Sequence, residues 1–203
     1  MKPEIQKTSQ ISPGQSVICI IGSDQIPEWL NLSKQENDFV QSQLQAKEEY
    51  IFINSYERCT YLVRLKDGIT HYKVREELRR TSYNLRKLIK RNNHSELVIT
   101  SDKAYKGAIE DLAEGLLLSF YSFDKYKTKP GEDEKKKYPA KLLLAGEIAD
   151  SDIKWLVDLT DAVYFTRDLI KEPVNHLNAA SLAEAIKKSG DSAGFRVEIL
   201  TKG

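Results

Sequence analysis

The chain has 203 residues, of which 40% are hydrophobic and 30% charged, a balance typical of a soluble globular protein with one domain, or one domain and a fragment. Its 31 lysines and arginines against 30 aspartates and glutamates give a formal net charge of +1, which argues against a dedicated nucleic-acid-binding protein because such proteins carry a basic excess. No segment has the roughly 18 apolar residues that span a membrane, and the polar amino terminus lacks a signal-peptide core, so we expect a cytoplasmic protein.

The first part of the chain alternates strand-like and helical patterns. The β-branched run SVICIIG, residues 16–22, predicts a buried strand that glycine ends. The segment SKQENDFVQSQLQAK that follows predicts a helix, and Ser33 and Glu36 have the spacing of a capping box at its start. Two β-rich runs, YIFINS and TYLVRL, are separated by four polar residues and predict an antiparallel hairpin.

Residues 72–91 form the clearest amphipathic helical pattern of the chain. Apolar residues recur at helical spacing at Val74, Leu78, Leu85, Leu88 and Ile89, and the other faces carry Arg75, Arg79, Arg80, Arg86, Lys87 and Lys90. The run ELVITSD then predicts a strand, with a helix start at Ser101 or Asp102. The next helix carries Ala108, Ile109, Leu112, Leu116 and Leu117 on one side. Gly107 and Gly115 within this pattern predict a helix packed tightly against the sheet, because each glycine costs about 1 kcal/mol in a helix interior.

The second part begins with a break. Residues 127–141, KTKPGEDEKKKYPAK, combine proline, glycine and mixed charges without periodicity and predict an exposed loop. KLLLAG predicts a strand, and a long helix is expected from Asp152 to about Lys171, where Pro173 stops it. SLAEAIKKSG predicts another helix and FRVEIL another strand.

Alternating strands and helices predict an α/β fold in which a mixed sheet is covered by helices. The last predicted helix and strand are too short to bury a core of their own. We therefore expect this final segment to be the opening of something larger or an appendage that packs on the first domain.

Residues that could perform catalysis are few. His71, His94 and His176 fall in separate segments, and none forms a metal-ligand pair. Cys19 and Cys59 lie in apolar runs, which favours buried hydrophobes over a disulfide or metal role. Glycine-rich phosphate loops and a Gly-x-Ser-x-Gly elbow are absent. The acidic residues of GEDEKKK are interpreted as a self-neutralising loop tip rather than a cation site.

The segment SFYSFDKYKTK, residues 119–129, has two interpretations. Aromatic residues interleaved with lysines can stack on bases and bind phosphates. The favoured alternative is that the aromatic residues anchor the end of the preceding helix in the core, while the lysines lie near its carboxyl end. The aromatic residues concerned are Phe120, Tyr121, Phe123 and Tyr126.

Two stretches resemble the leucyl aminopeptidases, also called cytosol aminopeptidases or peptidase family M17. In AEGLLLSFYSFDKYKTK the matching residues are Glu114, Gly115, Tyr121, Phe123, Tyr126 and Lys127. In FTRDLIKEPVNHLNAASLAEA they are Arg167, Asp168, Leu169, Pro173, Asn175, Leu177, Leu182 and Ala183. Lys171 departs from the family's asparagine, and Asn178 with Ala179 departs from its Thr-Pro.

The resemblance implies a macro-domain-like amino-terminal domain at residues 1–150, a linker helix at 151–173, and the truncated start of the catalytic domain at 174–203. It implies a parent enzyme that removes amino-terminal residues from peptides with two divalent ions, zinc or manganese, and that assembles as a hexamer. No catalytic, cofactor or metal residue is then expected in this chain. Structural roles are expected for Arg167, Asp168, Pro173, Asn175, Gly115 and Tyr126.

The sequence is also compatible with two other functions. A macro-like sheet can bind a nucleotide or ADP-ribose at the carboxyl ends of its strands, although the chain lacks glycine-rich loops there. A nucleic-acid-binding domain would use Arg75, Arg79, Arg80 and Arg86 with the lysines near Tyr126, and its affinity would fall strongly with salt.

Overall fold

The computed structural model describes residues 2–22, 25–66, 70–102, 106–127 and 138–200. It divides into two compact units, Met1–Thr160 and Asp161–Gly203, and the division lies inside helix α4 (Asp150–Lys171). The predicted loop at residues 127–141 falls mostly outside the described residues.

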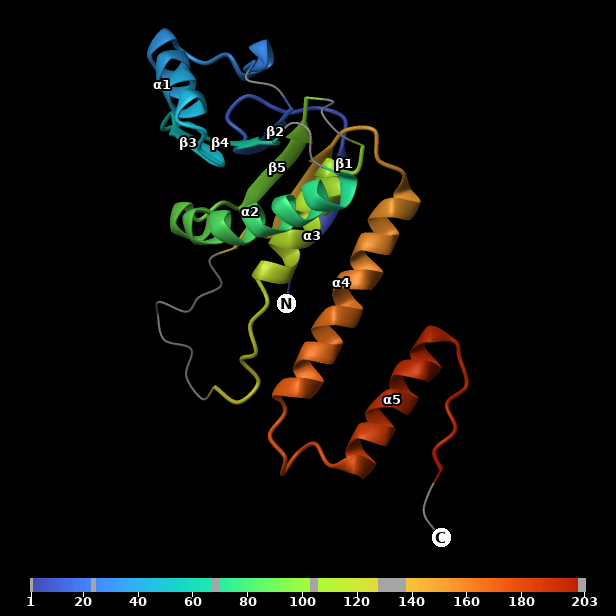
Figure 1. Cartoon of the computed structure of the whole chain (residues 1–203). Coiled ribbons are helices and arrows are strands. Elements are labelled where there is room, and N and C mark those ends of the chain that lie inside the picture. Colours follow the sequence, from blue (N-terminus) through green and yellow to red (C-terminus); the bar gives the residue numbers. More distant parts are fainter. Residues whose placement is uncertain (1, 23–24, 67–69, 103–105, 128–137, 201–203) are drawn as a thin grey trace. The chain divides into compact units, whose positions relative to one another are not determined.

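The first unit contains a six-stranded sheet with the order β1-β6-β5-β2-β4-β3 (Figure 1). The strands are β1 (Glu4–Thr8), β2 (Val17–Ile21), β3 (Tyr50–Asn54), β4 (Cys59–Arg64), β5 (Glu96–Ser101) and β6 (Lys141–Ala145). All neighbours are parallel except β3 and β4, which form the predicted antiparallel hairpin with Tyr50 opposite Val63. The prediction of an α/β fold with a mixed sheet is confirmed.

The strands in the middle of the sheet are apolar on both faces. Every residue of β2 is buried, as are four consecutive residues of β4 and of β5. Helices cover both faces of a parallel sheet, which explains why these strands are continuous β-branched runs. Strand β1 was not predicted, because it is an edge strand with the polar sequence EIQKT, whose Glu4 and Lys7 are exposed.

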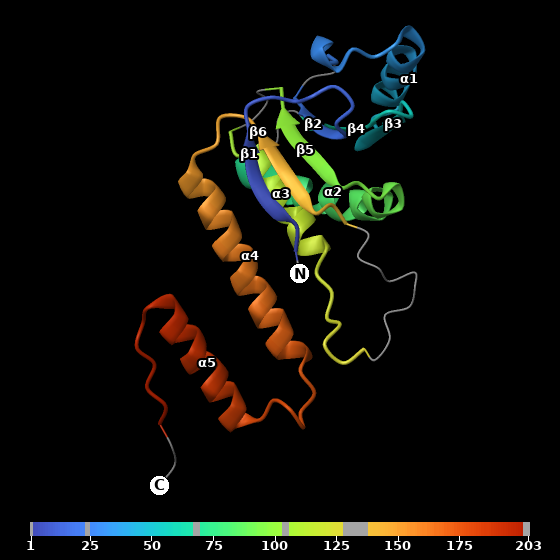
Figure 2. The same ribbon diagram turned by 180° about the vertical axis from the view of Figure 1, so that it is seen from behind.

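One face of the sheet packs on helices α2 (His71–Asn92) and α3 (Ala108–Ser119), which lie in front of the strands in Figure 1 and behind them in Figure 2. This larger core also contains Leu156 from the start of α4. The predicted stripe of α2 is buried at Val74, Leu78, Leu85 and Ile89, whereas Leu88 is only partly buried.

Helices α2 and α3 approach each other closely at Gly115. A Cβ atom at this position would lie 2.8 Å from the Cα of Arg79 and from the Cβ and Oγ of Ser82. Ser82 Oγ also donates a hydrogen bond to the Leu112 carbonyl oxygen at 2.9 Å. The expected close approach therefore exists, but its partner is α2 rather than the sheet.

The prediction for the start of α3 was wrong. The helix begins at Ala108, and its N-cap residue is Gly107, with φ of +90° and no side-chain cap. Gly107 is thus a left-handed turn residue in open space and not a helix-interior glycine. Asp102 has another role: its Oδ1 accepts the backbone N–H of Gly22 at 3.1 Å, which ties the end of β2 to the end of β5.

The other face packs on the 3₁₀ helix η1 (Glu28–Leu30) and helix α1 (Lys34–Gln45), which form a second core around Leu30, Val40 and Leu44. The predicted capping box of α1 is present. Ser33 Oγ accepts the Glu36 N–H at 3.2 Å, and Glu36 Oε2 accepts the Ser33 N–H at 2.8 Å. These bonds satisfy amide groups that the first helical turn leaves unpaired.

The predicted long helix is confirmed as α4, and the predicted short helix as α5 (Ala179–Ala193). Before the division at Thr160, α4 is tied to the amino terminus, because Lys2 Nζ donates to the Val157 carbonyl at 3.1 Å and to Thr160 Oγ1 at 2.9 Å. None of the described helices has the length and apolar content needed to cross a bilayer.

The second unit ends differently from the prediction. FRVEIL is not a strand: described residues 195–200 have no regular secondary structure. A strand requires a neighbouring backbone as hydrogen-bond partner, and this segment instead folds back on α5. The N–H groups of Gly194 and Phe195 bond the Gly190 carbonyl oxygen, and Phe195 and Val197 lie against Gly190, where a Cβ would clash.

Candidate functional site

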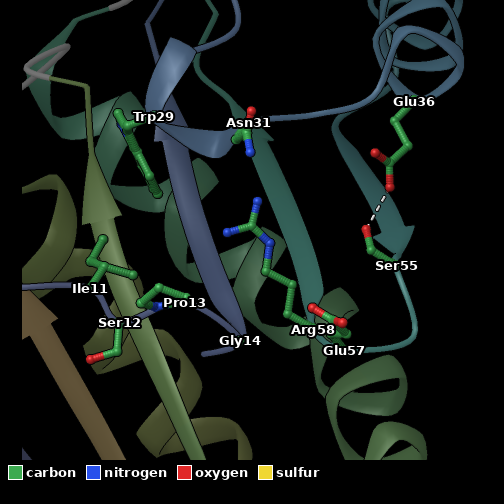
Figure 3. A pocket seen from close by; sticks show the side chains of 10 residues that line it. All are labelled: Ile11, Ser12, Pro13, Gly14, Trp29, Asn31, Glu36, Ser55, Glu57 and Arg58. Atoms are coloured by element: carbon green, nitrogen blue, oxygen red, sulfur yellow. Dashed lines mark hydrogen bonds between the residues drawn. The ribbon is translucent and has the colours of Figure 1, made fainter.

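A pocket of about 400 Å³ lies in the first unit, at the amino ends of the parallel strands β2 and β4 (Figure 3). Three separate segments form it: the loop before β2, the region of η1 and the start of α1, and the hairpin turn before β4. The lining residues are Ile11, Ser12, Pro13, Gly14, Trp29, Asn31, Glu36, Ser55, Glu57 and Arg58. None of them was predicted as a site residue.

The two sides of the pocket differ in chemistry. In Figure 3 the Trp29 ring, Ile11 and Pro13 lie on one side, while the Arg58 guanidinium points toward Asn31 in the middle. Arg58 Nη2 donates a hydrogen bond to the Leu30 carbonyl oxygen. This bond holds the guanidinium in place and leaves its other N–H groups for a ligand.

The acidic part of the pocket is organised by Glu36. Its Oε1 accepts a hydrogen bond from Ser55 Oγ at 2.5 Å, drawn as a dashed line in Figure 3. This bond, then the bonds from Ser33, and then the charge of Arg58 lower the pKa of Glu36. Glu36 therefore stays ionised, and with Glu57 it gives the pocket two carboxylates beside one guanidinium.

The structure describes only in part the carboxyl ends of the parallel strands, where a nucleotide would be expected to bind in a macro-like sheet. Asp102 and Gly22 are joined there, and residues 23–24 and 103–105 lie outside the described part of the chain.

The arginines of α2 mostly face α3. Arg75 Nε lies 2.9 Å from Asp111 Oδ1, and Arg79 Nη2 lies 2.7 Å from Glu114 Oε2. Both carboxylates are buried, and burial raises the pKa of Asp111 even though Arg75 and Arg79 oppose this shift. Arg86 Nη1 donates to the Ser119 carbonyl oxygen at 3.0 Å. Three of the four arginines proposed as a nucleic-acid surface are thus bonded to the neighbouring helix.

The aromatic segment after α3 anchors the core through one residue. Phe120 is buried and stacks on Tyr138 with ring centroids 5.5 Å apart. Tyr121 and Phe123 are only half-buried. Tyr126 is exposed, and Lys125 Nζ lies 5.5 Å from the centre of its ring. The expectation that all four aromatic side chains anchor the helix is wrong for Tyr126, because the chain has already left the core there.

In the second unit, the structure places four of the predicted structural residues around the turn that follows α4. Arg167 and Asp168 lie in the last turns of α4, and the Asp168 carbonyl oxygen accepts the Glu172 N–H at 3.1 Å. The Pro173 carbonyl oxygen accepts the N–H groups of His176 and Leu177 at 2.8 and 2.9 Å, which closes a turn that contains the exposed Asn175.

The residue that caps α5 is Asn178, which departs from the family pattern and was not predicted as a structural residue. Asn178 is the N-cap of α5: its Oδ1 accepts the N–H groups of Ala180 and Ser181, each at 3.0 Å. Ser181 Oγ accepts the Asn178 N–H in return, at 2.9 Å. An asparagine before a helical pattern is itself a capping signal, so the sequence could have shown this role.

Metal-donor residues are dispersed. No group of three or more His, Cys, Asp or Glu side chains within the described residues has the geometry to hold a metal ion. His94 Nε2 is hydrogen-bonded to the Tyr61 hydroxyl at 2.7 Å instead. Cys19 is fully buried, as predicted, whereas Cys59 is only half-buried, and both are free thiols. The described residues therefore do not fit a dinuclear metal centre.

The curated proteins compared below are all cytosol aminopeptidases. No family model matches the chain. Among curated proteins it is 38% identical over 101 residues to a probable cytosol aminopeptidase from Rhizobium rhizogenes. It is 33% identical over 127 residues to one from Sulfurihydrogenibium sp. and 32% over 124 residues to one from Aquifex aeolicus. The chain is similar to the amino-terminal part of cytosol aminopeptidases.

The relatives are much longer than the matched region. The three matches cover 47%, 58% and 60% of this chain, but only 20%, 24% and 24% of the respective cytosol aminopeptidases. Two solved structures share the fold. A mutant of tomato leucine aminopeptidase aligns over 95% of this chain and 43% of its own, with a TM-score of 0.70 and 13% identity. The bottromycin maturation enzyme BotP, in complex with Mn, aligns over 89% and 37%, with a TM-score of 0.61 and 15% identity.

Proposed function

We propose that this chain is the amino-terminal, non-catalytic portion of a dinuclear metal-dependent leucyl aminopeptidase that removes amino-terminal residues from peptides in the cytoplasm. The observation that carries the proposal is the sequence match to the amino-terminal part of cytosol aminopeptidases. The shared fold supports it.

The proposed division of the chain follows from this assignment. Residues 1–150 form a macro-like domain, 151–173 a linker helix, and 174–203 the entry into the catalytic domain. Two divalent ions, zinc or manganese, would be held by residues of the catalytic domain. They would polarise the peptide carbonyl and generate the attacking hydroxide, which is the chemistry that such ions supply.

The amino-terminal domain would serve assembly of a hexamer and access to the active sites. Exposed large apolar side chains of the second unit would be available for contact with the proposed catalytic domain. They are Phe165, Ile170, Val174, Ile186 and Leu200.

A domain replacement tests the proposal. In the Aquifex aeolicus relative, the matched amino-terminal region is replaced by the corresponding residues of this chain, and the same relative with that region deleted is the control. We expect the chimera to hydrolyse leucyl p-nitroanilide and to keep the oligomeric mass of the intact relative by light scattering. A chimera that loses assembly and activity to the extent of the deletion control would contradict the proposed role.

A further inference from the structure

The pocket at the amino ends of β2 and β4 has no role in the proposed function. It combines an apolar wall of Trp29, Ile11 and Pro13 with the guanidinium of Arg58 (Figure 3). The volume is in the range of small-molecule sites, and the lining divides into this apolar wall and a polar side with several hydrogen-bonding groups.

Arg58 is the group that selects the ligand. The hydrogen bond to the Leu30 carbonyl fixes its position. None of the ion pairs among the described residues includes Arg58, although its charge acts on Glu36. Glu36 is nearby, but Ser33 and Ser55 already bind its carboxylate oxygens. A fixed, unpaired guanidinium favours an anionic planar partner that can accept two parallel N–H bonds.

The neighbouring charges restrict which anion can bind. Glu36 and Glu57 both line the pocket, and two carboxylates beside one guanidinium repel a doubly charged phosphate more strongly than a singly charged carboxylate. They also favour a positive group close to the ligand's carboxylate. The apolar wall lies opposite Arg58 in Figure 3, where an aliphatic or aromatic side chain can pack.

We propose that this pocket binds an apolar amino-acid residue that carries a free α-carboxylate. The Arg58 guanidinium binds the carboxylate, and Trp29, Ile11 and Pro13 contact the side chain. Two sources have this chemistry, a free amino acid and the carboxyl terminus of a peptide. A free amino acid also carries an ammonium group, for which Glu57 is the available acceptor.

The inference does not rest on the proposed function, because every lining residue belongs to the first unit and binding requires no turnover. If the proposed function holds, the amino acids that the enzyme releases have this chemistry, and the pocket would bind the product of the reaction.

The test uses the 203-residue chain with Trp155→Phe, which leaves Trp29 as the reporter, since the chain has two tryptophans. We expect L-leucine to change the Trp29 emission saturably and leucinamide, which lacks the carboxylate, to have no effect. N-acetyl-leucine separates the sources. Binding as tight as that of leucine indicates a peptide carboxyl terminus, and loss of binding indicates a free amino acid.

Variants then assign the contacts. Arg58→Leu should weaken leucine binding at least about tenfold, the loss expected for a hydrogen bond between charged groups. Arg80→Leu, which removes an exposed arginine of α2, should leave binding unchanged. If far-UV circular dichroism shows that Arg58→Leu is misfolded, amide chemical shifts of the unmodified chain replace it, and leucine should shift Gly14, Asn31 and Arg58.

Four results would overturn the proposal. The first three are the absence of a saturable response to both leucine and N-acetyl-leucine, equal binding of leucinamide, and stronger binding of inorganic phosphate than of leucine. The fourth is a set of amide chemical-shift changes confined to residues outside the pocket.

Discussion

The contact between α2 and α3 at Gly115 makes a quantitative prediction about stability. In Gly115→Ala the new methyl group would lie 2.8 Å from the Cα of Arg79 and from two atoms of Ser82. A backbone Cα cannot rotate away, so the two helices must separate. Overpacking of this kind costs about 1–3 kcal/mol.

Two further effects modify this value. Separation of the helices weakens the hydrogen bond from Ser82 to the Leu112 carbonyl, worth about 1 kcal/mol. Alanine in place of glycine stabilises the helix by about 1 kcal/mol. These two contributions roughly cancel, so the free energy of unfolding should fall by about 1–3 kcal/mol. A loss of about 2 kcal/mol lowers Tm by roughly 4–8 °C in a chain of this length.

Urea unfolding followed by far-UV circular dichroism measures this change as a lower midpoint with an unchanged m value. The matched control is a double-mutant cycle that combines Gly115→Ala with Ser82→Gly, because Ser82→Gly removes two of the three clashing atoms. Alanine at position 115 should then cost about 1 kcal/mol less than in the wild type. If Gly115→Ala is neutral or stabilising in the wild-type chain, the helices do not approach as described and the reasoning is refuted.

Three other predictions concern single side chains. Burial lowers the pKa of His94 below 6.5, so the folded state favours the neutral ring. The free energy of unfolding should therefore fall as the pH drops from 6.5 through that lowered pKa. Urea titrations at several pH values should show a weaker pH dependence for His94→Gln. Asn178→Ala should reduce the stability of α5 by about 1 kcal/mol, seen as faster amide exchange in that helix, and unchanged exchange would exclude the cap. Burial raises the pKa of the Cys19 thiol to about 12. Iodoacetamide reacts with the thiolate and should therefore label Cys19 only after unfolding. Rapid labelling of the native chain would contradict the burial of Cys19.

Much of the fold could be predicted because its signals are local. The capping box of Ser33 and Glu36, the β3–β4 hairpin and the apolar stripe of α2 each depend on residues a few positions apart. The errors arise where a neighbouring backbone determines whether a segment forms a strand. The polar strand β1 forms because β6 offers a backbone ladder, and FRVEIL is not a strand because the described residues offer it none.

The candidate pocket could not be predicted for the same reason. Ile11 and Arg58 belong to two loops and Trp29 to the 3₁₀ helix η1, and only the order of the strands brings these segments together. Arg58 had no motif around it, and its importance follows from its position beside Leu30 and the apolar wall. Similarly, the sequence shows that α2 is basic, but only the packing shows that Arg75 and Arg79 pair with α3.

The central claim is that this chain supplies a non-catalytic part of an aminopeptidase, and hydrolysis of leucyl p-nitroanilide by the purified 203-residue chain tests it most directly. With manganese or zinc added, we predict no release of nitroaniline above the same metal in buffer. Turnover that is proportional to the concentration of the chain, follows it through purification and disappears with a chelator would contradict the claim.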